Sequence, residues 1–222
     1  MKNVWTILLK KYDVIRSSAI SHFISHLRIT RTPRRALGNL TKGHKTMENI
    51  SQTPIKPSVR AVENKIAVLF ICHGNICRSP MAEFIFKDMV SKQGLSDRFY
   101  IASAATSTEE IWNGIGNPVY PPAREELSKH GIDCKGKRAV QLTKADYDKY
   151  DYILGMDYWN LKNMLRILKS DPEDKVKLLL DYSDDPRDIA DPWYTGGFDV
   201  TYSDVVEGCE AFLEYLKDKK KL

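Results

Sequence analysis

The chain has 222 residues, of which 42% are hydrophobic and 28% charged, a length that suits one α/β domain of about 150 residues with an appendage. Its formal net charge of +5 is unevenly distributed. Residues 1–60 hold 12 Lys and Arg against two Asp and Glu, and the remaining residues hold 22 Lys and Arg against 27 Asp and Glu. The basic balance belongs to the N-terminal part, so we expect no nucleic-acid binding by the domain. Four cysteines without a secretory signal predict a reducing, cytoplasmic compartment.

The first 63 residues form an extension with two parts. Residues 4–29 place apolar side chains near helical spacing among Lys and Arg, and residues 36–63 are polar and proline-containing, like a linker. No apolar run approaches the ~20 residues that a membrane span needs. Three interpretations stay open: weak contact of residues 1–29 with a membrane surface or a partner, an Arg-rich targeting segment, or, favoured here, a poorly ordered or untranslated segment with Met47 as the functional start.

From residue 64 to 218 the chain alternates short apolar strands with helices, and a Lys-rich tail follows at 219–222. The apolar runs predict strands at 66–71, 99–104, 152–156 and 176–180. The helical patterns fall at 81–91, 123–130, 160–168 and 205–216. This alternation indicates an α/β domain with a four-stranded parallel sheet and helices on both faces.

The loop after the first predicted strand places a thiol and a guanidinium six residues apart. It reads Cys72-His-Gly-Asn-Ile-Cys-Arg78-Ser79-Pro80 and opens a helix. Unpaired N–H groups at a helix N-terminus, together with the helix dipole, attract a phosphate and also stabilise a thiolate. Arg78 can hold two phosphoryl oxygens, and Ser79 can donate a hydrogen bond to the thiolate. The predicted phosphate-binding residues are His73, Gly74, Asn75, Ile76, Cys77, Arg78 and Ser79, with Cys72 as nucleophile.

Two plainer interpretations of this loop exist. A cysteine at the end of a strand is commonly a small core residue, and the six-residue spacing alone occurs by chance. A metal site needs four well-spaced ligands, whereas Cys134 and Cys209 are distant and lack a second closely spaced pair. We therefore expect no metal and no cofactor.

The full string from Cys72 to Pro80 resembles the low-molecular-weight protein tyrosine phosphatases, which carry Cys-x-Gly-Asn-x-Cys-Arg-Ser-Pro here. The resemblance covers about residues 65–216. The resemblance implies the α/β fold of that family. It also implies a phosphomonoester hydrolase that acts on phosphotyrosine proteins through a phosphocysteine intermediate. It also implies loop support from Asn75, Ser79 and Ser103, with Lys137 in place of a family histidine. Cys77 would be a redox partner of Cys72, unless it is merely a small loop residue.

A second motif, Asp191-Pro192-Trp193-Tyr194, follows about 110 residues after the loop. Expulsion of an alkoxide or phenoxide by Cys72 needs an acid to protonate the leaving oxygen. The family supplies its general acid from an Asp-Pro followed by aromatics late in the chain. We therefore predict Asp191 as the general acid and base, with Asp188 as the close competitor.

Aromatic side chains and one loop position bear on the substrate. Trp112, Trp193 and Tyr194 are predicted to wall a slot for a phenyl ring. Ile76 favours phosphotyrosine, because the related protein arginine phosphatases prefer threonine there. The rivals are such an arginine phosphatase, an arsenate reductase on the same fold, and a phosphotyrosine-binding regulator without turnover. We expect a monomer or a weak dimer.

Overall fold

The computed structural model describes residues 65–222, and the predictions for residues 1–63 lie outside this part of the chain. The described elements follow one another as β1 (Ile66–Cys72), α2 (Arg78–Lys92), η1 (Ser96–Arg98), β2 (Phe99–Ala105), β3 (Ile111–Trp112), β4 (Ile115–Gly116), α3 (Pro121–Lys129), η2 (Lys144–Asp146), β5 (Tyr152–Gly155), α4 (Tyr158–Leu168), β6 (Val176–Leu178), η3 (Leu179–Tyr182), α5 (Pro192–Thr195) and α6 (Phe198–Asp218). Within these residues no helix is both long and apolar enough to cross a membrane.

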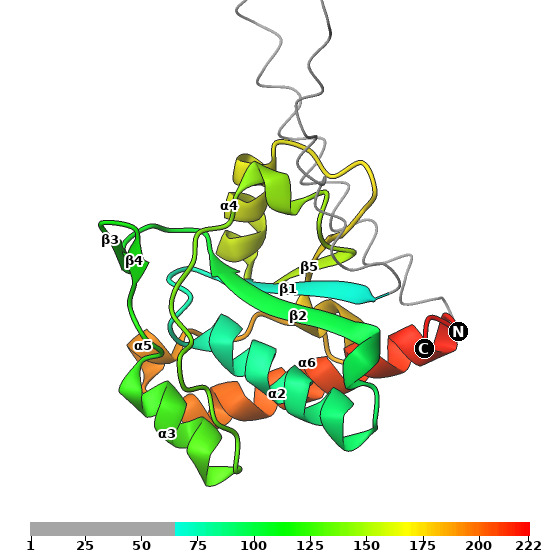
Figure 1. Ribbon diagram of the computed structural model, residues 1–222, viewed down its shortest axis with the longest axis horizontal. Helices are drawn as coiled ribbons and strands as arrows, with labels where there is room; N and C mark the ends of the chain where they lie inside the picture. Colours follow the sequence, from blue (N-terminus) through cyan, green and yellow to red (C-terminus); the bar gives the residue numbers. More distant parts are fainter. Residues whose placement is uncertain (1–64) are drawn as a thin grey trace, which may run out of the picture. The chain divides into compact units, whose positions relative to one another are not determined.

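Four parallel strands form the central sheet in the order β2-β1-β5-β6. Figure 1 shows α4 over one face of this sheet and α2, α3 and α6 over the other. A parallel strand covered on both faces is apolar along its whole length, as the run of β1 is. The predicted fold class, a parallel sheet between helices, is confirmed.

Side chains along β1 alternate between two hydrophobic cores, because successive residues of a strand point to opposite faces. Val68, Phe70 and Cys72 belong to the core beneath α2 and α6. Ala67, Leu69 and Ile71 belong to the core beneath α4. The alternation therefore turns Cys72 toward the face on which α2 begins.

Several elements differ from the sequence-based expectation. Helix α6 begins at Phe198, seven residues before the predicted start. The prediction missed this start because the polar residues of the first two turns hide the apolar pattern. The predicted fourth strand ends early, and its last residues enter the short helix η3. The β3–β4 hairpin was not predicted. Its turn residues Asn113 and Gly114 both have positive φ, as a tight hairpin turn requires.

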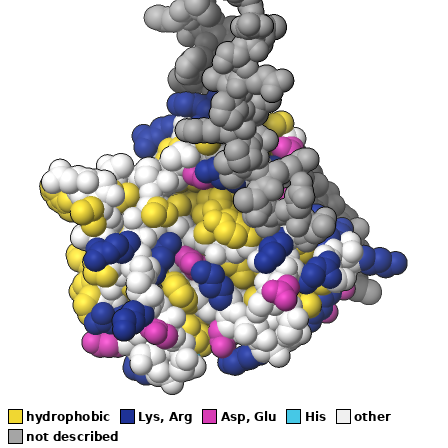
Figure 2. Space-filling view, viewed as in Figure 1, with side chains coloured by type: hydrophobic (Ala, Val, Ile, Leu, Met, Phe, Trp, Pro, Cys, Tyr) yellow, Lys and Arg dark blue, Asp and Glu magenta, His cyan; other side chains and the backbone are white. Residues whose placement is uncertain are grey.

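The edge strand β2 is partly covered by the chain after α3. Ala105 N donates to Val140 O at 2.7 Å, and Leu142 N donates to Ala105 O at 2.9 Å. Tyr100, nearer the start of β2, stacks on Tyr150 with ring centroids 5.8 Å apart. Figure 2 shows hydrophobic side chains gathered over the middle of this face. Val140 N also donates to Asn75 Oδ1 at 3.0 Å, so this segment ties the edge of the sheet to the loop that follows β1.

Candidate active site

The phosphate cradle lies between the last residue of β1, Cys72, and the first residue of α2, Arg78. Cys72 is buried, and its Sγ accepts hydrogen bonds from Asn75 N at 3.3 Å and from Ser79 Oγ at 3.0 Å. Asn75 has φ 57°, a left-handed conformation that asparagine tolerates better than most residues. The curled loop thus directs an amide and a hydroxyl at one sulfur, which is how a protein stabilises a thiolate.

Asn75 is the centre of a buried network that supports this loop. Its Nδ2 donates to Ser79 Oγ at 2.9 Å and to Ser103 Oγ at 2.8 Å, and its Oδ1 accepts from Val140 N at 3.0 Å. The Ser79 hydroxyl, having accepted from Asn75, donates to Cys72. The structure therefore brings the three predicted support residues into one chain of hydrogen bonds that ends at the sulfur.

Glu83 extends this network and was not found by sequence reasoning. Ser103 Oγ donates to its carboxylate, and Lys137 Nζ lies 3.0 Å from the same carboxylate and 2.9 Å from Ser103 O. Burial raises the pKa of Glu83, but the cations of Lys137 and Lys87 and the Ser103 hydroxyl outweigh it and hold that pKa below its ordinary value. Lys137 thus supports the loop through Glu83 and Ser103, not through Asn75.

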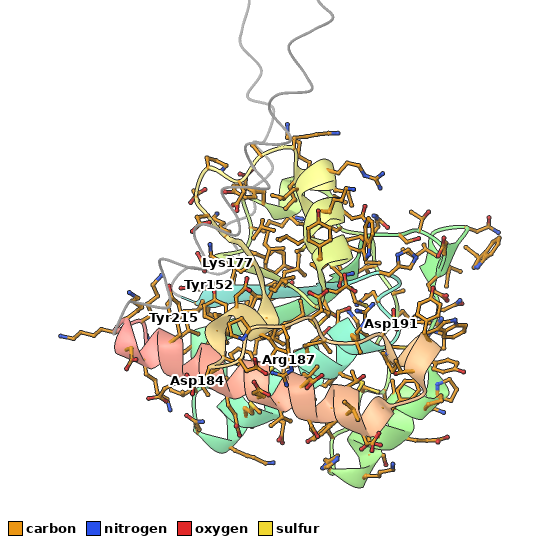
Figure 3. The ribbon with its side chains drawn as sticks, turned by 180° about the vertical axis from the view of Figure 1, so that it is seen from behind. Tyr152, Lys177, Asp184, Arg187, Asp191 and Tyr215 are labelled. Carbon is orange, nitrogen blue, oxygen red and sulfur yellow. The ribbon has the colours of Figure 1, made fainter. Side chains whose placement is uncertain are left out.

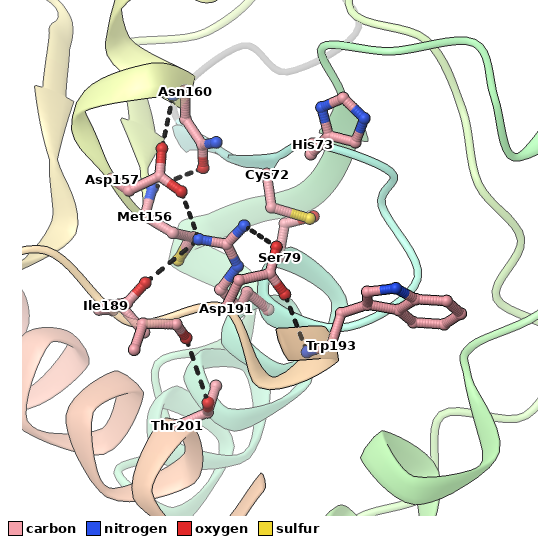
Figure 4. A network of polar contacts seen from close by, with 12 residues as sticks. Cys72, His73, Ser79, Met156, Asp157, Asn160, Ile189, Asp191, Trp193 and Thr201 are labelled. Atoms are coloured by element: carbon pink, nitrogen blue, oxygen red, sulfur yellow. Dashed lines mark hydrogen bonds and ion pairs between the residues drawn. The ribbon is translucent and has the colours of Figure 1, made fainter. Parts of the chain in front are cut away.

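Arg78 is buried and held on both sides by carboxylates. Its Nη1 pairs with Asp157 and donates to Ile189 O at 3.1 Å, while its Nη2 pairs with Asp191 (Figure 4). Burial disfavours the charged form of Arg78, but Cys72, Asp191 and Asp157 outweigh this and raise its pKa. The guanidinium therefore stays a fixed cation at the floor of the site.

Asp157 is a second residue that sequence reasoning missed. It is the N-cap of α4, where its Oδ1 accepts from Asn160 N at 2.6 Å while Oδ2 faces Arg78. A signal was present in the sequence: an aspartate directly after a buried strand and before a helix is both a capping residue and a residue at the ligand-binding edge of a parallel sheet.

Asp191 reaches the cradle from the far end of the chain. It caps α5, where its Oδ1 accepts from Trp193 N at 3.1 Å, and its other oxygen meets Arg78. The competitor Asp188 instead accepts from Tyr158 N at 3.1 Å and does not line the pocket described below. Of the two candidates, the structure places only Asp191 at the cradle.

A pocket opens above Cys72. It is lined by Cys72, His73, Gly74, Ile76, Cys77, Arg78, Glu109, Glu110, Asp191, Trp193 and Tyr194. Trp193 and Tyr194 are 57% and 85% exposed, and Trp193 packs against Tyr120 with centroids 5.1 Å apart. Trp112 lies on β3, is 71% exposed and is not in this lining. The structure therefore does not form the expected slot between Trp112 and Trp193.

Two glutamates at the pocket mouth were also missed. Glu109 Oε2 lies 2.8 Å from His73 Nε2, and this hydrogen bond lowers the pKa of the exposed Glu109. Glu110 accepts from Asn117 Nδ2 at 2.7 Å. The loop after β2 brings both to the mouth, and only the fold reveals that Glu109, 36 residues along the chain, meets His73.

The two cysteines of the cradle have different surroundings. All four cysteines of the described chain are free and buried. Burial raises the pKa of the Cys77 thiol, and the neighbouring Cys72 and Asp191 raise it further. Cys77 therefore remains a thiol, while Cys72 is the sulfur that receives two donors. Among residues 65–222 no cluster of three or more His, Cys, Asp or Glu could hold a metal ion.

Comparison with known proteins places this geometry in a family. The model of the family described as low molecular weight phosphotyrosine protein phosphatase matches residues 67–222. The chain belongs to this family. It is 39% identical over 159 residues to the low molecular weight protein-tyrosine-phosphatase YfkJ of Bacillus subtilis, covering 71% of this chain and 99% of YfkJ.

Solved structures agree with the family assignment. The crystal structure of YfkJ matches with a TM-score of 0.66 and 38% identity, over 71% of this chain and 98% of that one. The crystal structure of a Drosophila arginine phosphatase matches with a TM-score of 0.60 and 32% identity, over 68% and 97%. The predicted family and enzyme class are confirmed: the chain is a hydrolase of the low molecular weight phosphotyrosine protein phosphatases.

Proposed function

We propose that Cys72, Arg78 and Asp191 carry out the hydrolysis of a phosphotyrosine ester through a phosphocysteine. In the first step Cys72 Sγ attacks phosphorus, the bond from phosphorus to the phenolic oxygen breaks, and Asp191 gives its proton to that oxygen. The observation that carries the proposal is the convergence of three groups: a doubly hydrogen-bonded sulfur, a buried guanidinium and a carboxylate in contact with that guanidinium.

In the second step the Asp191 carboxylate takes a proton from water, whose oxygen attacks phosphorus and breaks the sulfur–phosphorus bond. Phosphate leaves and Cys72 returns as thiolate. Arg78 and the loop amides hold the equatorial phosphoryl oxygens through both steps, as preorganised donors do at a transition state that carries negative charge. Asp191 Oδ2, which contacts Arg78 Nη2 here, must turn from Arg78 to the leaving oxygen to act.

The pocket mouth supports an aryl substrate. Trp193 and Tyr194 present exposed rings beside Asp191, and aromatic rings favour contact with a phenyl group. Ile76 lines the pocket, which supports the preference for phosphotyrosine over phosphoarginine. An arginine phosphatase stays the second candidate, because one solved relative bears that name.

The test is hydrolysis of p-nitrophenyl phosphate by the wild type and two variants. Cys72→Ser is expected to be inactive while still binding vanadate, because the cradle amides and Arg78 remain. Asp191→Ala is expected to lose about 10²–10⁴-fold in rate with leaving groups that need protonation. Normal turnover by Cys72→Ser would refute the mechanism, and an unchanged rate for Asp191→Ala would move the acid elsewhere.

Other parts of the proposal rest on the sequence and on the site together. Cys77 is proposed as the redox partner of Cys72, since both thiols line one pocket. A reducing, cytoplasmic setting is proposed because four free cysteines are compatible with it. We also propose a monomer or weak dimer, and assign any membrane-surface contact to the basic residues 1–29.

A further inference from the structure

The segment that carries Asp191 has little structure of its own. Residues 183–191, between η3 and α5, form no helix or strand. Its last residues are held at three points: Ile189 N donates to Met156 O at 2.8 Å, Ile189 O accepts from Arg78 Nη1 at 3.1 Å, and Ala190 O accepts from Thr201 Oγ1 at 3.4 Å. The position of the proposed acid therefore depends on what fixes the segment as a whole.

Arg187 attaches this segment to α6 through charged hydrogen bonds. Its Nη1 and Nη2 donate to the two carboxylate oxygens of Glu207 at 2.9 and 2.7 Å, and Nη2 also donates to Asp204 at 2.7 Å. Nη1 donates back to Asp185 O at 3.0 Å, within the segment. A two-pronged guanidinium–carboxylate pair fixes direction as well as distance, so this side chain holds the segment against α6 in one orientation.

The charges around Arg187 make its role specific. The segment itself carries Asp184, Asp185 and Asp188, and α6 presents Asp204 and Glu207 to it. Without a cation between them these carboxylates repel one another. The hydrogen bonds that Arg187 donates to Glu207 and Asp204 raise the pKa of Arg187, and the bond to Glu207 lowers the pKa of Glu207. The Arg187 guanidinium thus offsets the repulsion between these carboxylates and binds the segment to α6.

We propose that Arg187 is a positioning residue for the general acid: by holding the segment on α6 it sets the place of Asp191 over the cradle. Arg187 is four residues before Asp191, and its side chain lies over α6 while Asp191 lies beside α5 (Figure 3). The proposal rests on the function assigned to Asp191 above. A displacement of about 1 Å in a catalytic group is enough to lower a rate by up to about 10²-fold.

The experiment compares wild type with Arg187→Met, which keeps length but removes charge and donors. We measure kcat/KM for aryl phosphates that run from 2,4-dinitrophenyl phosphate to phenyl phosphate. Expulsion of dinitrophenolate needs little protonation, so we expect Arg187→Met to lose less than about twofold in kcat/KM for 2,4-dinitrophenyl phosphate. For phenyl phosphate, whose leaving group depends most on the acid, we expect a loss of about tenfold in kcat/KM. Lys217→Met, which removes a cation near the other end of α6, is the matched control and should leave the whole series unchanged.

A second arm separates positioning from general destabilisation. In an Asp191→Ala background Arg187→Met should cost nothing further in kcat/KM, because two residues that act through one group are not additive. Inhibition by vanadate should stay within about threefold of wild type in Arg187→Met, and Arg187→Lys should recover part of the lost rate. An equal loss for every leaving group, or the same loss with Asp191 absent, would overturn the proposal. An inactive wild type would instead refute the proposed function.

Discussion

Asn75 shows how one residue can set the geometry of a reaction centre. Its side chain is 1% exposed, and all of its amide hydrogens and its carbonyl oxygen have partners, in Ser79, Ser103 and Val140. A fully satisfied buried network fixes a single arrangement, whereas a partly satisfied one costs free energy. The hydroxyl that reaches Cys72 is thereby oriented before any substrate arrives.

Glu83 should make the stability of the protein depend on pH in a predictable direction. Its pKa in the folded state lies below the ordinary value, so its contribution is fully present above the ordinary pKa and is lost as the pH falls through the folded pKa. We expect Glu83→Gln to lower the free energy of unfolding by about 1–3 kcal/mol at pH 7. The difference from wild type should shrink steadily as the pH falls from 5 to 3.

Urea unfolding across this pH range provides the measurement, and Glu214→Gln is its control. Glu214 forms an exposed pair with Lys217, and an exposed pair contributes about 0–1 kcal/mol. If the cost of Glu83→Gln stayed constant down to pH 3, the ionised carboxylate would not be the stabilising form.

At the scale of elements, the β3–β4 hairpin shapes the pocket mouth through a close backbone contact. A Cβ atom on Gly116 would lie 1.9 Å from Ala139 O. The neighbouring Asn117 O accepts from Ala139 N at 2.9 Å, and Asn117 N donates to Glu110 O at 2.8 Å. Glycine at this position lets the hairpin lie against the chain after α3 and so places Glu110 at the pocket.

Gly116→Ala should therefore separate the hairpin from the segment at Ala139. We expect a loss of about 1–3 kcal/mol in the free energy of unfolding, together with a changed KM because Glu110, which lines the pocket, moves. Thermal unfolding and steady-state kinetics measure the two effects. Ile115→Ala, a change at a residue that is 63% exposed on the same strand, should stay within about 0.5 kcal/mol of wild type; equal effects of the two variants would contradict the contact argument.

The limits of sequence reasoning follow from how far apart the partners lie. Cys72 and Arg78 were predictable because one loop contains both, and Asp191 because its Asp-Pro-aromatic motif is contiguous. Glu83 was not, because it acts on Ser103, whose proximity only the folded sheet creates. Asp157 carried a helix-capping signal, but its pairing with Arg78 was visible only in the fold. Four strands and four helices followed from apolar periodicity, whereas the β3–β4 hairpin is too short to show a period.

At the scale of the whole molecule, charge divides the chain into two unlike parts. Residues 65–222 hold 22 Lys and Arg against 26 Asp and Glu, so the basic balance of the chain comes from its first 60 residues. Within residues 65–222, the part of the chain that the structure describes, the cradle has its supporting hydrogen bonds and ion pairs. The chain also covers 99% of the Bacillus relative with only 71% of its own length.

A chain of residues 61–222 should therefore fold and turn over p-nitrophenyl phosphate with a kcat/KM within about twofold of the full chain. The comparison belongs at 0.15 M ionic strength, where the Debye length is about 8 Å and the long-range field of the 12 N-terminal cations is screened. At low salt the full chain should gain in rate on the dianionic substrate, because a positive field raises its local concentration. A loss of more than tenfold on truncation at 0.15 M would show that residues 1–60 contribute to the site itself.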